Sequence, residues 1–535
     1  MPRVRRTGEL VRHPVVMVAL VAALLRVPFL HAPMSPDEGG FLIVGQHWQS
    51  GGGSLYGPYW VDRPPLLIAF FRLANSLGGF EALRLLGCVV VALTVIGVGF
   101  AGSFLAATPR ASDRAALWSS LATAALLVTP TGGSLMVNGE LIAAPFIAFG
   151  LAFSMHALRG GARADASAIA AGVCATAAVM VKQNMADVAV FALVLGIAAV
   201  VRRRVPLVDV VRRLVLSAAG VVVSLVVVAV ASMLRGTSPW GVLYAMYPFR
   251  LRAAALMQQT NPHDRVAHLS KMLEMWGVTG APLLIAGFVA YLLLRRRPPS
   301  VPYGGAITLA LLALVAYDVA SILAGGSYWS HYVIQLVVPT ALMAGLLATQ
   351  VRRVGPLVVA AVMALSGLGW VLGLTARVSS DGPTIGAAIA ATAQPGDSML
   401  SLLGDGAMVR TSGLPAPYPY LWSLPAHVLD PHFRKLTAVL RSNAAPSWVV
   451  VRGPTTMGLL EREGPGRVLH ERYRLVTTLC QHPVYLRRDL SRRAPETDNG
   501  TCTAPIAPWT GDHATHRWTV TDGAPRWDLL SLRAR

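Results

Sequence analysis

Long apolar segments alternate with short polar connections over the first 375 residues of the chain. Many of them approach the roughly 20 residues that an α-helix needs to cross the hydrocarbon core of a membrane. The pattern predicts about eleven transmembrane helices, near residues 14–30, 83–106, 115–130, 138–158, 166–181, 185–201, 214–234, 276–294, 304–323, 332–349 and 356–375. The expected fold class is therefore a mainly α, polytopic membrane protein. No small-residue cleavage site follows 14–30, so we expect this helix to be retained and not removed as a signal peptide.

The charged residues agree with a membrane protein and predict its orientation. Only 13% of the 535 residues are charged, and the net charge of +20 comes mainly from Arg clusters in short connections. The basic connections are 110–114, 159–163, 202–213, 295–297 and 352–353, whereas 131–137 and 324–331 carry no Lys or Arg. By the positive-inside rule, the N-terminus is cytoplasmic and the segment after 375 is extracytoplasmic. No basic stripe interleaved with aromatic residues suggests a nucleic-acid partner.

The segment after residue 375 predicts a small extracytoplasmic α/β domain at 376–490, followed by a flexible tail at 491–535. Its expected helices are 385–393 and 436–443, and its expected strands are 398–403, 448–451 and 484–486. Cys480 and Cys502 are a candidate disulfide, because the exterior of a cell permits such a bond. Two other outside regions, 31–82 and 235–275, mix Trp, Tyr, Pro and Gly with apolar residues, which is typical of short helices at a membrane surface.

The first outside region carries the most informative chemistry. Asp37 and Glu38 are adjacent carboxylates directly after the first helix, and acidic residues at a membrane boundary need a partner or a function. One interpretation is that Asp37 only caps a surface helix. Another is that Asp37, Glu38 and His47 hold a divalent metal ion, although three residues of one loop do not define a ligand set. Further along, Asp62 and Arg63 precede twin prolines that stiffen the chain.

The order of these motifs resembles the C-type glycosyltransferase superfamily. The elements are a basic N-terminus, one helix, the outside Asp37-Glu38, a Gly-rich stretch with Tyr, the sequence Asp62-Arg63-Pro64-Pro65-Leu66, and Glu81 to Leu85. Within the superfamily the chain is similar to the family 39 group, which includes protein O-mannosyltransferases, aminoarabinose transferases and bacterial relatives. The resemblance covers about the first 200 residues by motif and the rest by architecture. It implies a transmembrane glycosyltransferase domain at 1–375 with a catalytic outside loop at 31–82.

The resemblance also implies a reaction. A sugar is moved from a polyprenyl phosphate to an acceptor on the outer face, with inversion at the anomeric carbon. The loop carboxylate of the family matches Asp37, which would be the general base, and Glu38 is its catalytic neighbour. The chemistry is reasonable because an attacking hydroxyl must lose a proton, and a positioned carboxylate can accept it. The departing lipid phosphate needs cations and hydrogen-bond donors.

Several residues are candidates for binding the donor and its phosphate. They are Asp62, Arg63, Arg84, Glu140, Lys182, His331 and Tyr332. Other interpretations remain open: Lys182 could extend to the membrane surface, and Tyr332 could belong to an aromatic belt. Relatives often carry an acidic residue near Glu140, sometimes after an Arg that this chain lacks, and Glu140 could instead pair with Lys182. Asp318, inside a predicted helix, has no motif to assign it.

Two classes of function remain after this reasoning. The favoured one is a glycosyltransferase of the cell envelope, using a polyprenyl-phosphate sugar; the alternative is a transporter or flippase of lipid-linked sugars. Transporters of that kind show internal repeats and broken helices at mid-membrane, and the hydropathy pattern shows no two-fold repeat. The sugar and the acceptor, whether glycan, lipid or protein, are not determined by the sequence. High Ala, Val, Arg and Gly with little Lys suggests a bacterial plasma membrane.

Overall fold

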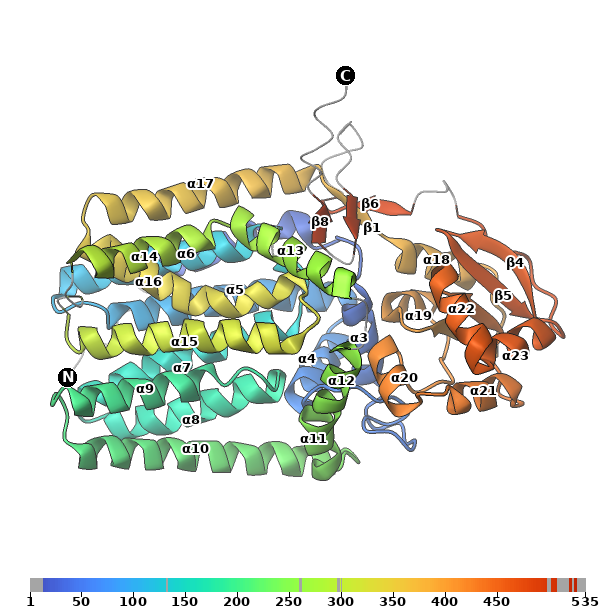
Figure 1. The fold of residues 1–535 in the computed structure, drawn as a ribbon, viewed down its shortest axis with the longest axis horizontal. Coiled ribbons are helices and arrows are strands. Elements are labelled where there is room, and N and C mark those ends of the chain that lie inside the picture. Colours follow the sequence, from blue (N-terminus) through green and yellow to red (C-terminus); the bar gives the residue numbers. More distant parts are fainter. Residues whose placement is uncertain are drawn as a thin grey trace, which may run out of the picture. The chain divides into compact units, whose positions relative to one another are not determined.

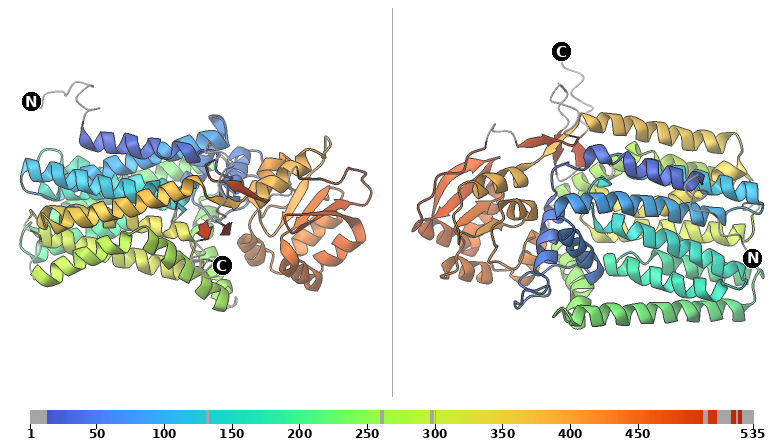
Figure 2. Two further views of the ribbon diagram at one scale, coloured as in Figure 1. Left: turned by 90° about the horizontal axis from the view of Figure 1, so that it is seen from above. Right: turned by 180° about the vertical axis from the view of Figure 1, so that it is seen from behind.

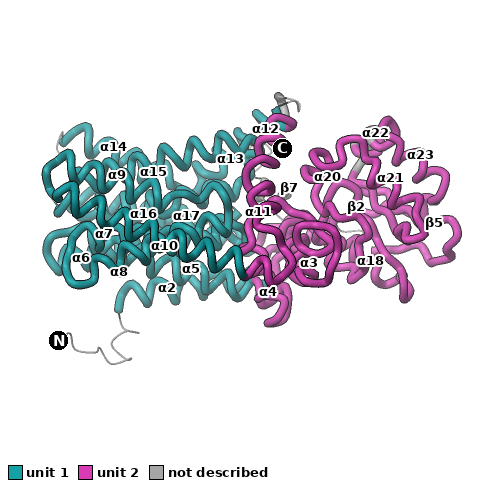
Figure 3. The backbone as a smooth tube through the Cα atoms, turned by 90° about the horizontal axis from the view of Figure 1, so that it is seen from below, with its two compact units in different colours: residues 1–30, 84–230, 257–374 teal, residues 31–83, 231–256, 375–535 magenta. Residues whose placement is uncertain are grey.

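The chain divides into two compact units, which Figure 3 colours separately. The structure is a computed structural model, and it describes residues 13–130, 133–258, 262–295, 299, 301–497, 502–507, 519–521 and 524–526. Unit 1 consists of Met1–Leu30, Arg84–Val230 and Met257–Leu374. Unit 2 consists of His31–Leu83, Ala231–Leu256 and Thr375–Arg535. The predicted catalytic loop is therefore in the same unit as the C-terminal domain.

Unit 1 is a bundle of long helices that run alongside one another (Figures 1 and 2). Every one of the eleven predicted segments is helical. The helices are α2 (Pro14–Leu24), α5 (Phe80–Ser103), α6 (Pro109–Val128), α7 (Gly139–Arg159), α8 (Ala164–Val181), α9 (Asp187–Val201), α10 (Leu207–Met233), α14 (Ala281–Arg295), α15 (Gly304–Gly325), α16 (Val337–Gln350) and α17 (Val354–Leu374). The 3-10 helix η1 (Val27–Phe29) follows α2, and η3 (Ser330–Leu336) leads into α16.

The apolar character of these helices shows a multi-pass membrane protein. Among the described residues, seven helices are long and apolar enough to cross a membrane, and a bent pair makes an eighth. The seven include α10, whose 18-residue apolar window is only 6% buried within the molecule. So much exposed hydrocarbon is stable only against lipid or another protein. Shorter apolar helices include α2 and α9, and α6 begins with the polar sequence Pro109 to Arg114.

The basic connections predicted from the sequence lie together at one end of unit 1, which we call the basic end. Arg159 donates to the carbonyl oxygen of Phe104 at 2.6 Å, and this contact joins the connections after α7 and α5. Arg213 donates to the carbonyl oxygen of Leu158 at 3.1 Å, which brings in the start of α10. Arg296 and Arg297 lie outside the described residues.

The bent pair consists of α13 (Pro262–Val278) and α14, which meet at 73°. Gly280 lies at the break with a φ of +75°, a conformation that other residues rarely adopt. Thr279 Oγ1 donates to the carbonyl oxygen of Trp276 at 2.6 Å and accepts from the amide of Ala281 at 3.2 Å. Because the helices end at the bend, these two backbone groups need other hydrogen-bond partners, and the Thr279 hydroxyl supplies them. The predicted span 276–294 therefore corresponds mainly to α14, and its first residues form the end of α13 and the bend.

The two regions that the sequence predicts to lie outside the membrane, 31–82 and 235–275, contain short helices, as expected. The first holds α3 (Pro36–His47) and α4 (Pro65–Ser76). The second holds α11 (Pro239–Met246) and α12 (Pro248–Gln258) and continues into α13. Each of the four short helices begins with a proline, whose fixed φ and missing N–H suit the first turn of a helix.

The C-terminal part of unit 2 is an α/β domain, which confirms the predicted class. Its main sheet has the order β2-β3-β5-β4, with β2 and β3 parallel and the other pairs antiparallel. The strands are β2 (Met399–Leu402), β3 (Trp448–Val451), β4 (Tyr473–Leu479) and β5 (His482–Arg487), and the helices are α18 (Asp381–Ala390), α19 (Gly406–Ser412), α20 (Ser423–Leu429), α21 (Arg434–Arg441), α22 (Gly453–Glu463) and α23 (Pro465–Arg472). Apolar side chains of β2 and β3 form one core with α21 to α23.

Part of the segment expected to be a flexible tail is paired into sheets. The strand β6 (Thr503–Pro505) pairs antiparallel with β1 (Arg377–Ser379), and β7 (Thr519–Thr521) pairs with β8 (Ala524–Arg526). The predicted disulfide is formed between Cys480 and Cys502, whose Cα atoms are 5.5 Å apart. It links β6 to the turn between β4 and β5, so the residues around Cys502 are fixed to the domain and do not form a loose tail.

Candidate functional site

The start of α7 positions an acidic residue at the end of the bundle opposite the basic end. Asn138 is the N-cap of α7, and its side-chain oxygen accepts from the amide of Leu141 at 2.9 Å. Glu140 therefore lies in the first turn, where the helix dipole favours a negative charge. The structure explains Asn138 as the cap of the helix that carries Glu140.

Four of the predicted donor-binding residues meet here. Lys182, the C-cap of α8, forms an ion pair with Glu140 of α7. Their exposed fractions are only 9% and 3%, so the pair is buried. His331 of η3 places Nε2 3.8 Å from Glu140 Oε1, and the Lys182 ammonium lies 4.3 Å from the centroid of the Tyr332 ring. We call Glu140, Lys182, His331 and Tyr332 the bundle cluster. Lys182 therefore forms an ion pair with Glu140 and a cation–π contact with Tyr332, and it does not extend alone to the membrane surface.

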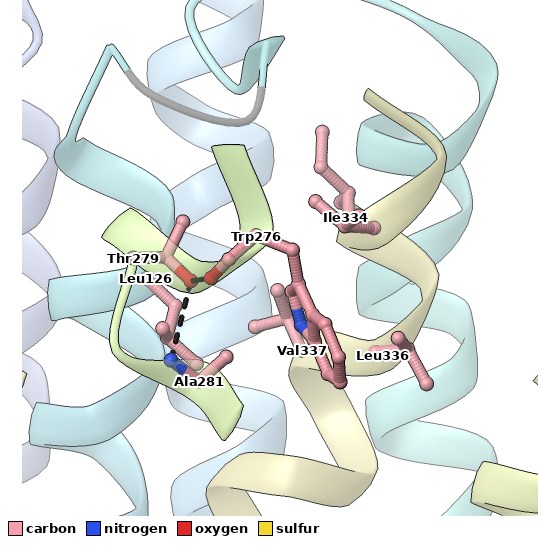
Figure 4. A pocket seen from close by; sticks show the side chains of 8 residues that line it. Leu126, Trp276, Thr279, Ala281, Ile334, Leu336 and Val337 are labelled. Carbon is pink, nitrogen blue, oxygen red and sulfur yellow. Dashed lines mark hydrogen bonds between the residues drawn. The ribbon is translucent and has the colours of Figure 1, made fainter. Parts of the chain in front are cut away.

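A close approach of two backbones fixes His331 in this cluster. Gly133 has a φ of +68°, and a Cβ atom there would lie 2.9 Å from the Cβ of His331. A side chain at position 133 would therefore push η3 away. Directly after Tyr332, the side chains of η3 line a small apolar pocket at the bend of α13 and α14 (Figure 4). Its walls include Trp276, Val333, Ile334, Leu336 and Val337.

Arg84, another predicted phosphate ligand, is buried and donates to the carbonyl oxygen of Leu135 at 3.0 Å. Arg26, which the sequence analysis did not single out, donates to the carbonyl oxygens of Leu127, Ser134 and Leu135. These two guanidinium groups fasten the connection between α6 and α7. The contacts give Arg84 a structural role, and its role in donor binding stays a prediction.

In unit 2 the two adjacent carboxylates of α3 have different surroundings. Ser35, and not Asp37, is the N-cap of this helix, so the capping interpretation of Asp37 is wrong. Glu38 closes a capping box: its carboxylate accepts from the amide and the hydroxyl of Ser35, each at 3.0 Å, and it is fully buried. This gives Glu38 a structural role. Asp37 is half-buried and accepts a hydrogen bond of 2.8 Å from the indole of Trp422.

Asp62 and Arg63 form an ion-pair cluster with a residue that the sequence analysis missed. Asp62 Oδ2 lies 2.9 Å from Arg63 and 2.8 Å from Arg250 of α12. Burial alone would raise the pKa of Asp62, but the two guanidinium groups outweigh it and hold the pKa below its usual value. Tyr56 donates to the carbonyl oxygen of Arg63 at 2.7 Å, and this bond fixes the backbone before the twin prolines. The result is a cationic cluster with one buried carboxylate.

The structure does not bring Asp37, Glu38 and His47 together as a metal-ligand set among the described residues. The one group of three acidic, Cys or His side chains with close ligand atoms in that part of the chain is Asp381, Cys480 and Cys502. Its two sulfur atoms form the disulfide, so they are not available as thiolate ligands. A divalent metal ion therefore stays a hypothesis from the sequence.

Asp318 of α15 belongs to a buried polar network that the sequence analysis did not find. Asp187, the first residue of α9, and Asp318 are both 0% exposed. Gln335 of η3 donates to Asp318 at 2.9 Å, and Asn184 donates to the Gln335 oxygen at 3.2 Å. Asn184 follows Lys182 by two residues, so the network borders the bundle cluster. The signal available in the sequence was the run Lys182-Gln183-Asn184, which is polar between two apolar helices.

The fold defined here is a multi-pass helical membrane domain with an α/β domain at its C-terminus, and known structures share it. AglB, the archaeal oligosaccharyltransferase from Archaeoglobus fulgidus, solved with an inhibitory peptide and a dolichol-phosphate, is similar with a TM-score of 0.50 and 10% sequence identity. The match covers 82% of this chain and 69% of AglB. The chain therefore shares the fold of this solved oligosaccharyltransferase, in agreement with the fold that the motif resemblance predicted.

ArnT from Cupriavidus metallidurans is a second similar structure. Bound to undecaprenyl phosphate, it matches 90% of this chain and 98% of its own, with 16% identity and a TM-score of 0.45. In the apo state the identity is 14% and the TM-score 0.42. No protein-family model and no curated protein matches the sequence.

Proposed function

We propose that the chain is a membrane glycosyltransferase that moves a sugar from a polyprenyl-phosphate donor to an acceptor on the extracytoplasmic face. The observation that carries the proposal is the bundle cluster, in which Lys182 and His331 meet at one end of an apolar helix bundle. A lipid phosphate needs cations at the boundary between hydrocarbon and water, and a buried ion pair is expensive to maintain without a function. The shared fold supports the same class of reaction.

The bundle cluster is suited to hold the phosphate of the donor. An ammonium group carries three donor hydrogens, so a phosphate can bind Lys182 by joining or replacing the Glu140 carboxylate. His331 adds a second donor when protonated. The apolar side chains that follow Tyr332 in η3 offer contacts to the first part of a hydrocarbon chain. The leaving group is already an anion, so these residues need to stabilise its charge and not to protonate it.

Asp37 is the general base in this proposal. The acceptor hydroxyl attacks the anomeric carbon, the bond to the phosphate oxygen breaks on the opposite side, and the hydroxyl proton passes to Asp37. Attack opposite the leaving group inverts the anomeric configuration. The half-buried position of Asp37 in the first turn of α3 leaves its carboxylate open to an incoming hydroxyl. Glu38, closed in its capping box, supports the helix that presents Asp37.

The proposed orientation places the N-terminus in the cytoplasm and the α/β domain outside the plasma membrane. It follows from the basic end of unit 1, because cytoplasmic connections carry an excess of Arg and Lys. The bundle cluster is at the other end of the same helices, so this orientation puts it at the extracytoplasmic surface. The sugar and the acceptor stay open between hexose, pentose and amino sugar, and between glycan, lipid and protein.

Mass spectrometry of lipid that co-purifies with the protein tests the donor. We expect a polyprenyl phosphate bearing a sugar in wild type, and a reduced amount in Lys182→Met. A matched control is Lys271→Met, which removes a Lys from α13 outside the bundle cluster. With a supplied acceptor hydroxyl or water to take up the sugar, the purified protein should then release free polyprenyl phosphate from that donor. Assays with and without EDTA test the metal hypothesis. Movement of the intact lipid across proteoliposomes without release would instead identify a flippase.

A further inference from the structure

A tryptophan of the C-terminal domain contacts the proposed base directly. The indole Nε1–H of Trp422 donates to Asp37 Oδ1 at 2.8 Å. The two residues are 385 positions apart in the sequence, and both belong to unit 2. Trp422 is the N-cap residue of α20, and Asp37 lies in the first turn of α3. Two helix N-terminal segments are therefore joined at the carboxylate.

The position of the Trp422 ring is closely constrained. Its centroid lies 5.1 Å from that of Phe41, one turn along α3 from Asp37. A Cβ atom at Gly40 would lie 2.4 Å from Cζ2 of the indole, so only glycine lets the ring approach the helix at this point. The ring therefore packs against the same face of α3 that carries the carboxylate. A single rotamer of Trp422 satisfies both the hydrogen bond and this packing.

The segment that leads into Trp422 is fastened to the same loop by two more contacts. The amide of Trp60 donates to the carbonyl oxygen of Pro419 at 3.0 Å, and the hydroxyl of Tyr59 donates to that of Ala416 at 3.3 Å. At α19, Arg410 donates to Gln46 near the end of α3. The C-terminal domain thus holds the catalytic loop at several places, and Trp422 is the contact that reaches the acidic group.

We propose that Trp422 is a positioning residue for the general base, an inference that rests on the proposed function of Asp37. An indole N–H is a donor only, so it cannot compete for the acceptor's proton and leaves the second carboxylate oxygen to accept it. It also fixes the orientation of the carboxylate, and misplacement of a reacting group by about 1 Å can cost roughly 100-fold in rate. The C-terminal domain thereby contributes to the chemical step and not only to acceptor choice.

Trp422→Phe tests this inference, because it keeps an aromatic ring and removes the N–H. The expected result is a fall of up to about 100-fold in kcat with little change in KM, since the carboxylate stays in α3 but loses the donor that orients it. The matched control is Trp370→Phe in α17, which removes an indole hydrogen bond of 2.7 Å to the carbonyl oxygen of Leu25, outside the catalytic loop. The control should leave kcat and KM unchanged.

A second measurement makes the inference independent of turnover. Infrared spectra of the Asp37 carboxylate, isolated by subtraction of the Asp37→Asn spectrum, read its stretching frequencies in wild type and in Trp422→Phe. A change of these frequencies in the variant supports the inference, because a hydrogen bond to one carboxylate oxygen changes the strength of both C–O bonds. Equal frequencies, or an equal change in Trp370→Phe, would overturn it. Wild-type protein that fails to turn over any polyprenyl-phosphate sugar would overturn the proposed function, while the infrared result still decides the role of Trp422.

Discussion

Lys182 and Glu140 form a buried ion pair across two helices, at the end of the bundle opposite the basic end. Each side chain stabilises the other at a place where an unpaired charge would be costly. The pair also positions Lys182 over the ring of Tyr332 and beside His331. If the pair is only structural, the double variant should regain both stability and lipid binding. If Lys182 binds phosphate, the double variant should regain stability alone.

Lys182→Met leaves the Glu140 carboxylate buried without its cation. We expect a loss of about 3–5 kcal/mol in the free energy of unfolding, measured by denaturation in detergent. The double variant Lys182→Met with Glu140→Gln removes both charges and should recover most of that stability. Retention of the lipid phosphate should stay low in the double variant. Full recovery of lipid binding together with stability would show that the pair is structural only.

Glu38→Gln separates the two adjacent carboxylates of α3. A glutamine side chain can still accept from the amide of Ser35, so the capping box is kept. We expect the melting temperature and the rate of sugar transfer to change little. Transfer assays and thermal unfolding of the same preparation check this. A loss of turnover as large as that of Asp37→Asn would assign chemistry to Glu38, as the sequence alone had suggested.

The buried Asp62 predicts a pH dependence of stability. Arg63 and Arg250 hold its pKa below the usual value in the folded protein, so its ion pairs stabilise the fold above about pH 4 and are lost as the pH falls through the lowered pKa. Asp62→Asn should therefore be less stable than wild type at pH 7, and the difference should shrink in acid. The control is Asp165→Asn, since Asp165 forms an exposed pair with Arg212. A constant difference between Asp62→Asn and wild type across this range would contradict the prediction.

The disulfide between Cys480 and Cys502 closes a loop of 22 residues. For a loop of this length, the entropy removed from the unfolded chain is worth about 3 kcal/mol. Replacing both residues by Ser should lower the stability of the α/β domain by about this amount, measured by proteolysis of the intact protein. Cys174→Ser, in α8, is the control. Non-reducing peptide mapping that found two free thiols would contradict the presence of this disulfide.

The helices and the bundle cluster were predictable from the sequence for definite physical reasons. A lipid-facing helix must be apolar over a fixed length, so each of the eleven segments was visible as a run. Glu140 and Lys182 stood out because ionisable groups beside apolar helices need partners, and their pairing was one of the interpretations that the sequence left open. Strand β4 was missed because its residues are largely half-buried or exposed, and it has no clear apolar alternation.

The roles of Trp422, Arg84 and Glu38 were not predictable, because each depends on a contact that only the folded structure shows. Trp422 is 385 residues from Asp37, and no pattern in the sequence brings the two together. Arg84 resembles a phosphate ligand in the sequence, but in the structure it donates to the backbone carbonyl oxygen of Leu135. Every residue has such a carbonyl, so no sequence pattern marks this partner. Glu38 shares its dipeptide with Asp37, and only the geometry of Ser35 distinguishes the capping carboxylate from the half-buried one.

The most direct test of the central claim is the release of polyprenyl phosphate by Asp37→Asn, using the sugar-bearing lipid that co-purifies with the protein. Loss of a general base is expected to slow transfer by about 10²–10⁴-fold while the donor stays bound. Asp113→Asn, which changes an exposed aspartate at the basic end, should turn over at the wild-type rate. Wild-type turnover by a folded Asp37→Asn would contradict the account.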